Sequence, residues 1–215
     1  FLYTEAVCQI KKIVEKNEFG DLLYYDSTRI NLGLIQNDVN VLWDLAVHDL
    51  AILNYISKLN PVEVSAVGHK HIKNKPETAA YLTIKYQNNF IAHINVNWLS
   101  PVKIRKTILG GSNKMIVYND LEPSDKIIIY KKGVNIVKKQ NSSANLIKYK
   151  IGDTLIPSLK NKEALAEAVS EFYRSITEKR FNSKSNGIDG LNVVNILEAA
   201  DKSMAKNGKP MKVSK

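Results

Sequence analysis

The sequence predicts an α+β domain built on an open, mainly antiparallel β-sheet with helices on one face. Two observations lead to this fold class. Residues 61–151 form a series of short β-rich runs separated by turns, while amphipathic helical patterns lie before and after this stretch. Helices and strands segregated in this way are typical of helices packed on one face of an antiparallel sheet. A chain of 215 residues can bury roughly 70% of its unfolded surface, so we treat residues 1–215 as a single domain.

The N-terminal part begins with a helix and a strand. Thr4 is placed to cap a helix that runs to about Asn17, and Gly20 can supply the left-handed conformation that ends it. Residues 22–32 are β-rich and form the first predicted strand, with Arg29 near its end. A short loop then leads into the next helix.

Residues 38–56 predict the helix around which the candidate site is built. Asp38 or Asn40 can cap its start, and the proline after Asn60 disfavours its continuation. Its apolar residues recur at helical spacing: Leu42, Leu45, Ala46, Leu50, Leu53 and Ile56. Packing does not require three polar residues inside it: Asp44, His48 and Asp49.

The period of the pattern changes to two after Pro61, which indicates strands. The predicted strands are residues 62–68, 78–86, 90–98, 102–109, 114–118, 126–130 and 146–151. Residues 87–89 form the turn of a hairpin between two of them. The chain then returns to helix, first in a run capped by Asn161 and then in residues 191–204, before a short strand at residues 211–213.

Several predicted strands have apolar residues on both faces. Ile127, Ile128 and Ile129 are consecutive, as are Ile116 and Val117, whereas a strand with one solvated face alternates apolar and polar residues. We therefore expect another subunit to cover part of the second face of the sheet, in a homodimer or a homotetramer.

The composition excludes several classes of protein. The net charge of +10 comes from 31 basic and 21 acidic residues, but the lysines are scattered along the chain, so no nucleic-acid partner is expected. No apolar run is long enough to span a membrane, and one cysteine excludes an internal disulfide framework. The first residues lack a signal-peptide pattern, so we expect a cytoplasmic protein. Because the chain begins with Phe1 rather than Met, we also expect further sequence upstream.

Asp44 and His48 are four residues apart, so an α-helix places them on one face, one turn from each other. A carboxylate beside an imidazole can take part in proton transfer, because histidine titrates near neutral pH. The alternative is a helix whose polar face contains a histidine with no chemical role.

Other chemical motifs are absent or depend on the tertiary fold. The glycine pair at residues 110–111 joins two predicted strands with no helix after it, so it is a turn rather than a phosphate-binding loop. His69 and His71 share a strand face and, together with Asp44 and His48, would make a set of ligands for zinc or iron. This metal site is an alternative that requires the strand and the helix to meet.

Longer stretches resemble the glucose–fructose oxidoreductase / inositol dehydrogenase / MocA family. The segment N-V-L-W-D-L-A-V-H-D, from Asn40 to Asp49, is similar to the D-x-x-x-H motif of that family. The strand S-T-R-I-N-L-G before it, and H-I-N-V-N-W-L-S-P-V-K-I-R and G-G-S-N-K-M-I-V-Y-N-D after it, also resemble family members. So do the C-terminal stretches F-Y-R-S-I and G-L-N-V-V-N-I-L-E-A-A-D-K-S. The resemblance covers nearly the whole chain and looks closest to the branch that oxidises nucleotide-linked sugars.

This resemblance implies a two-domain parent enzyme. Its N-terminal Rossmann domain would bind NAD or NADP and would supply a catalytic lysine from an E-K-P motif. Neither G-x-G-x-x-G nor E-K-P occurs in this sequence. Cofactor-binding residues are therefore expected outside it, and residues 1–215 are expected to be a substrate-binding and oligomerisation domain that is inactive alone. An alternative is a free-standing sugar-binding or oligomerisation module.

The resemblance also gives the candidate residues their roles. His48 would accept the proton of a sugar hydroxyl as hydride leaves the same carbon, and Asp44 would orient the imidazole or a hydroxyl. Arg29 would bind a carboxylate or phosphate of the substrate, unless it is an ordinary surface residue at a strand end. The other candidate contacts to a sugar or nucleotide-sugar substrate are Asn40, which can also cap the helix, and Trp43. Lys103 and Arg105 share one strand face and could hold an anionic group of the substrate, unless that face is simply solvated.

Overall fold

The structure is a computed structural model that describes residues 1–138, 145–179 and 184–214. Within these residues, a nine-stranded open sheet has the order β10-β7-β6-β5-β1-β4-β3-β2-β11. Only β1 and β4 pair in parallel, and the other neighbours in this sheet are antiparallel. The strands are β1 (Leu22–Leu32), β2 (Pro61–His69), β3 (Ala79–Tyr86), β4 (Ile91–Asn97), β5 (Leu99–Gly111), β6 (Met115–Asn119), β7 (Ile127–Tyr130), β10 (Thr154–Leu155) and β11 (Met211–Lys212).

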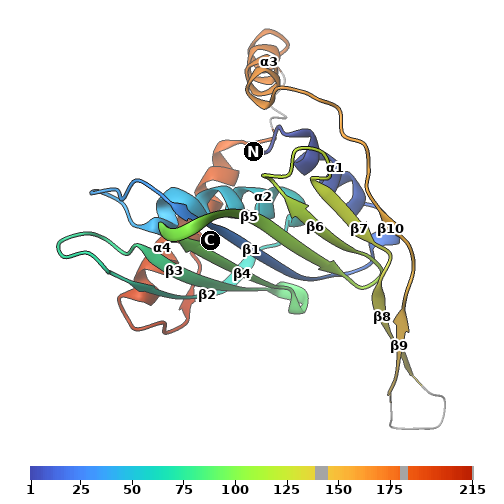
Figure 1. Cartoon of the computed structure of the whole chain (residues 1–215), viewed down its shortest axis with the longest axis horizontal. Helices are drawn as coiled ribbons and strands as arrows, with labels where there is room; N and C mark the ends of the chain where they lie inside the picture. The colour runs from blue at the N-terminus through green and yellow to red at the C-terminus, as the bar shows by residue number, and fades with distance from the viewer. Residues whose placement is uncertain (139–144, 180–183, 215) are drawn as a thin grey trace.

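Three helices cover one face of this sheet: α1 (Glu5–Val14), α2 (Val47–Ser57) and α4 (Gly187–Met204). Helix α2 lies between α1 and α4, and α4 also packs on β2 (Figure 1). Fully buried side chains such as Leu53 of α2 and Ile94 of β4 fill the layer between helices and sheet. The predicted α+β fold class, with an open and mainly antiparallel sheet, is therefore confirmed.

The N-terminal elements follow their local sequence signals. The Thr4 hydroxyl accepts a hydrogen bond from the Val7 amide at 3.4 Å and caps α1. A single 3-10 turn, η1 (Asn17–Phe19), separates α1 from β1. Gly20 closes that turn with a φ of +80°, which glycine adopts at no steric cost, so its predicted terminator role is confirmed for η1 rather than for α1.

The helix predicted over residues 38–56 is shorter and is divided. It starts with a π-helical turn, η2 (Leu42–Ala46), in which the Val47 amide donates to the Leu42 carbonyl five residues earlier. Helix α2 continues to Ser57 and ends at Lys58, which has a left-handed backbone conformation. Of the two predicted caps, Asn40 is the one whose side chain accepts hydrogen bonds from the first amides of the turn.

The later elements correct three predictions. Strand β8 (Gly133–Lys138) pairs with β9 (Asn145–Lys150) in a separate two-stranded hairpin, and β10 pairs with β7; neither β8 nor β10 was predicted. Helix α3 (Ala164–Thr177) is capped by Glu163 rather than Asn161, because the Glu163 carboxylate accepts from two amides of the first turn. Helix α4 begins before residue 191, since Asn186 and Asp189 form a capping box there.

Helix α3 stands away from the sheet on an extended arm (Figure 1). None of its residues is buried. Its exposed apolar residues are Leu165, Val169, Phe172, Tyr173 and Ile176, each 59–69% exposed. No helix among the described residues is long and apolar enough to cross a membrane.

No helix of the described residues lies on the second face of the sheet. Tyr81 of β3 and Ile91 of β4 are 52% and 43% exposed there. The Tyr81 ring stacks on His93 with a centroid distance of 6.4 Å, and His93 Nδ1 lies 3.6 Å from a carboxylate oxygen of Asp26. This face is thus a mixture of apolar, aromatic and polar groups, and its cover by another subunit stays a prediction.

Candidate active site

His48 lies in the first turn of α2, on the side of the sheet that carries the helices. It is half-buried, and its ring lies against the ring of Phe1 with centroids 4.8 Å apart. Burial lowers the pKa of His48 below its usual 6.5, and the positive charges of Arg29 and Arg105 lower it further, although Asp49 opposes them. The imidazole is therefore neutral at pH 7 and can accept a proton.

Among the described residues, no hydrogen bond joins the Asp44 carboxylate to the His48 imidazole. That carboxylate accepts a hydrogen bond from the indole N–H of the buried Trp98 at 2.7 Å. The spacing argument assumed a regular α-helix, whereas Asp44 lies inside the π-helical turn η2 and His48 lies in α2. The predicted role of Asp44 toward a sugar hydroxyl stays a prediction.

Arg29 is part of a buried ion pair inside the fold. Its Nε and Nη2 atoms donate to the two carboxylate oxygens of Asp49, at 2.6 and 3.2 Å. Ser27 donates to the same carboxylate at 2.8 Å. Because Arg29 is only 2% exposed, the alternative of an ordinary surface arginine is wrong. Burial acts to lower the pKa of Arg29, but the hydrogen bonds and charge of Asp49 outweigh it, so the net shift is upward and the guanidinium stays charged.

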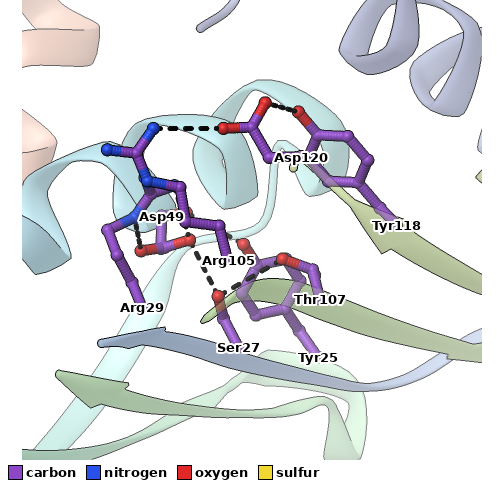
Figure 2. Close-up of polar contacts among 8 residues, drawn as sticks. All are labelled: Tyr25, Ser27, Arg29, Asp49, Arg105, Thr107, Tyr118 and Asp120. Atoms are coloured by element: carbon purple, nitrogen blue, oxygen red, sulfur yellow. Dashed lines mark hydrogen bonds and ion pairs between the residues drawn. The ribbon is translucent and has the colours of Figure 1, made fainter. Parts of the chain in front are cut away.

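Arg105 lies directly opposite Arg29 in the antiparallel pairing of β1 with β5. Figure 2 shows its guanidinium reaching Asp120, with an Nη1 to oxygen distance of 3.4 Å. The other oxygen of Asp120 accepts from the Tyr118 hydroxyl at 2.8 Å. The two arginines are thus each paired with a different carboxylate, Asp49 on one side and Asp120 on the other.

Each of these guanidinium groups keeps one buried N–H without a partner. Among the described residues, Arg29 Nη1 and Arg105 Nε are the buried side-chain atoms that make no hydrogen bond. Both guanidinium carbons lie close to the Phe1 ring, 4.7 Å from its centroid for Arg29 and 5.9 Å for Arg105. His48, Arg29 and Arg105 therefore meet around a single aromatic ring.

The other predicted substrate contacts lie at different places. Asn40 and Trp43 donate to the two carboxylate oxygens of Asp201, at 2.8 and 2.7 Å, and so connect the η2 turn to α4. Lys103 is exposed and lies on the same face of β5 as Arg105, as its two-residue spacing predicts. Substrate binding by Asn40, Trp43 and Lys103 stays a prediction.

A polar cleft of about 740 Å³ begins beside this centre. Tyr118 and Asp120 form part of its wall, so the Arg105–Asp120 pair lies at the border between the cleft and His48. The rest of the wall comes from the start of α1, the loop after β6 and the arm before α3. Its charged residues are Glu5, Asp120, Asp125, Lys126, Lys160 and Lys162.

The alternative metal site receives no support. The described residues contain no group of three or more His, Cys, Asp or Glu side chains placed to hold one ion. His69 and His71 are both exposed, their rings contact each other edge to face, and His71 Nδ1 is hydrogen-bonded to Thr78 Oγ1 at 2.8 Å.

Sequence reasoning missed three residues of this centre. Asp49 was noted as unnecessary for packing, but nothing in the sequence connects it to Arg29. Phe1 lies outside the stretches that resemble the family, and Asp120 ends one of them but was given no role. A signal for Asp49 exists in retrospect, because a buried carboxylate on an apolar helix requires a cation.

Together, the fold and this centre define an α+β domain with a buried arginine–carboxylate network and a neutral histidine at its edge. The family model described as the GFO/IDH/MocA C-terminal domain matches residues 7–117. The chain therefore belongs to the glucose–fructose oxidoreductase / inositol dehydrogenase / MocA family, as the sequence motifs predicted. A comparison with curated proteins finds no significant match.

Solved structures of similar fold are oxidoreductases. One is UDP-N-acetylglucosamine 3-dehydrogenase GnnA from Acidithiobacillus ferrooxidans, with a TM-score of 0.70 and 19% sequence identity. The matched region covers 95% of this chain and 61% of the GnnA chain. GenD2 from gentamicin A biosynthesis, in complex with NAD, matches 100% and 62%, with a TM-score of 0.76 and 16% identity. Levoglucosan dehydrogenase, in complex with NADH and L-sorbose, matches 100% and 64%, with a TM-score of 0.71 and 17% identity. The chain thus spans less than two thirds of the length of each.

Proposed function

We propose that this chain is the substrate-binding and oligomerisation domain of an NAD(P)-dependent oxidoreductase that acts on a hydroxyl of a sugar or nucleotide-linked sugar. The observation that carries the proposal is His48. Its imidazole is kept neutral by burial and by two nearby guanidinium groups, and it lies within residues 7–117, which the family model matches.

A neutral imidazole is suited to this reaction. Removal of hydride from a carbon that bears a hydroxyl gives a ketone only if the hydroxyl proton also leaves, and His48 can accept that proton. The nicotinamide ring would supply the hydride acceptor when the cofactor is bound. After this transfer, the negative charge of Asp49 would stabilise the protonated imidazole of His48.

The described residues do not fit the cofactor itself. Gly110 and Gly111 end β5 and lead into β6, so no helix N-terminus follows them to hold a phosphate. We propose that a Rossmann domain outside this chain binds the NAD or NADP. The proposal is supported by the lengths of the structural relatives, of which this chain spans 61–64%.

The apolar face of α3 is a further support. A helix of 14 residues with no buried side chain gains no stability from packing, and most helices in proteins depend on such packing. A domain that covered Leu165, Phe172 and Ile176 would give α3 this stabilising packing. Helix α3 and the first residues of the chain are adjacent, since Tyr3 donates a hydrogen bond to Glu171 of α3 at 3.1 Å.

The cleft beside Asp120 favours a large substrate. Its volume of about 740 Å³ lies in the range of ligand sites, which is roughly 300–1,000 Å³. A nucleotide-linked sugar could place its sugar at His48 and the rest of the molecule in the cleft. The name of the relative GnnA, a dehydrogenase of a UDP-linked sugar, agrees with this choice.

Two measurements test this function. The 215-residue chain, mixed with NAD(P)⁺ and UDP-linked sugars, should give no absorbance change at the reduced-nicotinamide band. The same chain preceded by its own upstream gene sequence should turn over, and His48→Gln should reduce that turnover by about 10²- to 10⁴-fold. The matched control is His69→Gln, at an exposed histidine. Turnover by the chain alone would sink the two-domain proposal, and an unaffected His48→Gln variant would sink the proposed base.

A further inference from the structure

Arg29 and Arg105 form a cross-strand pair of like charges. They are directly opposite in the register of β1 with β5, on the face of the sheet that carries the helices. Like charges at directly opposite positions destabilise a sheet, and water screens this pair only from the side of Arg105, which is 30% exposed, because Arg29 is almost fully buried. A pair that costs stability beside the candidate base is a candidate for a functional role.

Each arginine of the pair has its own aspartate as counter-charge. Asp49 binds Arg29 through both carboxylate oxygens, and Asp120 binds Arg105 through one contact at 3.4 Å while it also accepts from Tyr118. In the described part of the chain, Arg29 Nη1 and Arg105 Nε are left as buried, unpaired N–H groups. More than nine in ten buried polar groups of this kind have a hydrogen-bond partner, so two unpaired ones on adjacent arginines require an explanation.

The ring of Phe1 now occupies the position beside both groups. Its centroid is 4.7 Å from the Arg29 guanidinium carbon and 5.9 Å from that of Arg105, distances at which an aromatic ring attracts a cation. Phe1 is 36% exposed and is not one of the buried core residues, so the core does not depend on its ring. An aromatic face replaces only part of the hydrogen bonding that an oxygen anion would give.

We propose that Arg29 Nη1 and Arg105 Nε bind an oxyanion of the substrate, a carboxylate or a phosphate, close to the hydroxyl that His48 deprotonates. This inference rests on the proposed function and narrows its substrate class to acidic sugars or sugar phosphates. Guanidinium groups suit the role because their planar forks donate paired hydrogen bonds to carboxylate and phosphate oxygens. The oxyanion would take the place of the Phe1 ring between the two arginines.

Binding to the 215-residue chain tests this directly and requires no cofactor. D-glucuronate and D-glucose have the same ring and differ by a carboxylate. Titrating the chain with each sugar and monitoring its amide chemical shifts gives two dissociation constants, whose ratio measures the contribution of the oxyanion to binding. Glucuronate should bind at least ten-fold more tightly than glucose, since a charged hydrogen bond contributes about 1.5–3 kcal/mol, or about 10- to 100-fold. D-glucose 6-phosphate serves as the phosphate arm, and its preference over glucuronate would identify phosphate as the oxyanion.

Two variants locate the effect. Arg105→Gln should abolish the preference for either anion, and Arg105→Lys, which retains the charge without Nε, should lose most of it. Arg174→Gln on the exposed α3 is the matched control and should keep the preference. Circular dichroism and thermal unfolding check that each variant is folded.

Every outcome is decisive. If neither anion binds at least ten-fold more tightly than glucose, or if the preference survives in folded Arg105→Gln, the oxyanion site is wrong. Failure of the proposed dehydrogenase activity would appear separately, as anion binding by this chain without turnover by the longer protein.

Discussion

The ring of Phe1 lies against the imidazole of His48, with a centroid distance of 4.8 Å and an angle of 55° between the planes. The contact connects the first residue of the chain to the first turn of α2. It also shields the imidazole from water, and burial is the largest cause of the lowered pKa of His48. Phe1 therefore helps to set the protonation state of the candidate base.

Replacement of Phe1 by alanine should raise the pKa of His48 toward its usual 6.5, because water then reaches the imidazole. An NMR titration of the imidazole protons measures the value. Phe172→Ala, on the exposed face of α3, is the matched control and should leave the titration unchanged. An unchanged or lower pKa in Phe1→Ala would show that the ring contributes nothing to the shift.

The same shift predicts how stability depends on pH. The pKa of His48 is lower in the folded chain than the 6.5 of the unfolded chain, so the unfolded state binds more protons between these two values. The free energy of unfolding should therefore fall as the pH drops below about 6.5, by at most about 1.4 kcal/mol per pH unit for this group. Urea unfolding between about pH 5.5 and 7.5 measures this dependence, above the range in which ordinary carboxylates titrate.

His48→Gln should remove this part of the pH dependence, while His69→Gln, at an exposed histidine, should retain it. A wild-type slope in His48→Gln would contradict the assignment of the dependence to His48.

The fold was largely predictable because its strands and helices have strong periodic patterns. The alternation in β2, for instance, places Val64 and Ala66 in the core and leaves Val67 exposed, as a half-buried strand requires. The π-helical turn was not predictable, because it changes the backbone hydrogen bonds of Leu42–Ala46 without changing which residues are apolar. Strand β10 has two residues, too few for any pattern.

The sequence named three residues of the centre, but neither their partners nor their pairing. His48, Arg29 and Arg105 were named from the motif and from their residue types. Their contacts depend on elements far apart in the sequence: Arg29 meets Asp49 across the sheet–helix interface, and Asp44 meets Trp98, which lies between β4 and β5. The spacing of Asp44 and His48 was the most local argument, and it failed because it assumed regular α-helical geometry.

Loss of Asp49 should destabilise the chain strongly. Asp49→Leu would leave the guanidinium of Arg29 buried without its counter-charge, since both side chains are almost fully buried at 3% and 2% exposure. Removal of one partner of such a pair typically costs about 3–5 kcal/mol. Chemical denaturation of the variant measures the free energy of unfolding.

The double variant Arg29→Met/Asp49→Leu should be more stable than Asp49→Leu alone, because no buried charge is left unpaired. If the loss in free energy of unfolding in the double variant equalled the sum of the losses in Arg29→Met and Asp49→Leu, the view that the pair acts as one unit would be contradicted.

Helix α3 should contribute little to the stability of this chain. Phe172→Gln removes an aromatic side chain that is 69% exposed, so we expect a change within about 0.5 kcal/mol in the free energy of unfolding. Leu53→Ala, at a fully buried position of α2, should cost about 2–5 kcal/mol. A large loss in Phe172→Gln, measured by the same denaturation, would mean that another copy of the chain already covers the apolar face of α3.

The second face of the sheet should be the contact between subunits. Tyr81 of β3 is 52% exposed on that face, and a lysine there would replace an aromatic ring by a charge, which the core of a subunit interface disfavours. Tyr81→Lys should therefore shift the chain from dimer or tetramer toward monomer, as measured by sedimentation velocity across a range of concentrations. Leu34→Lys makes the same kind of change at a loop residue that is 86% exposed and should leave the oligomer intact. A wild-type chain that sediments as a monomer, or a Tyr81→Lys variant that sediments like the wild type, would place the subunit contact elsewhere or exclude it for this chain.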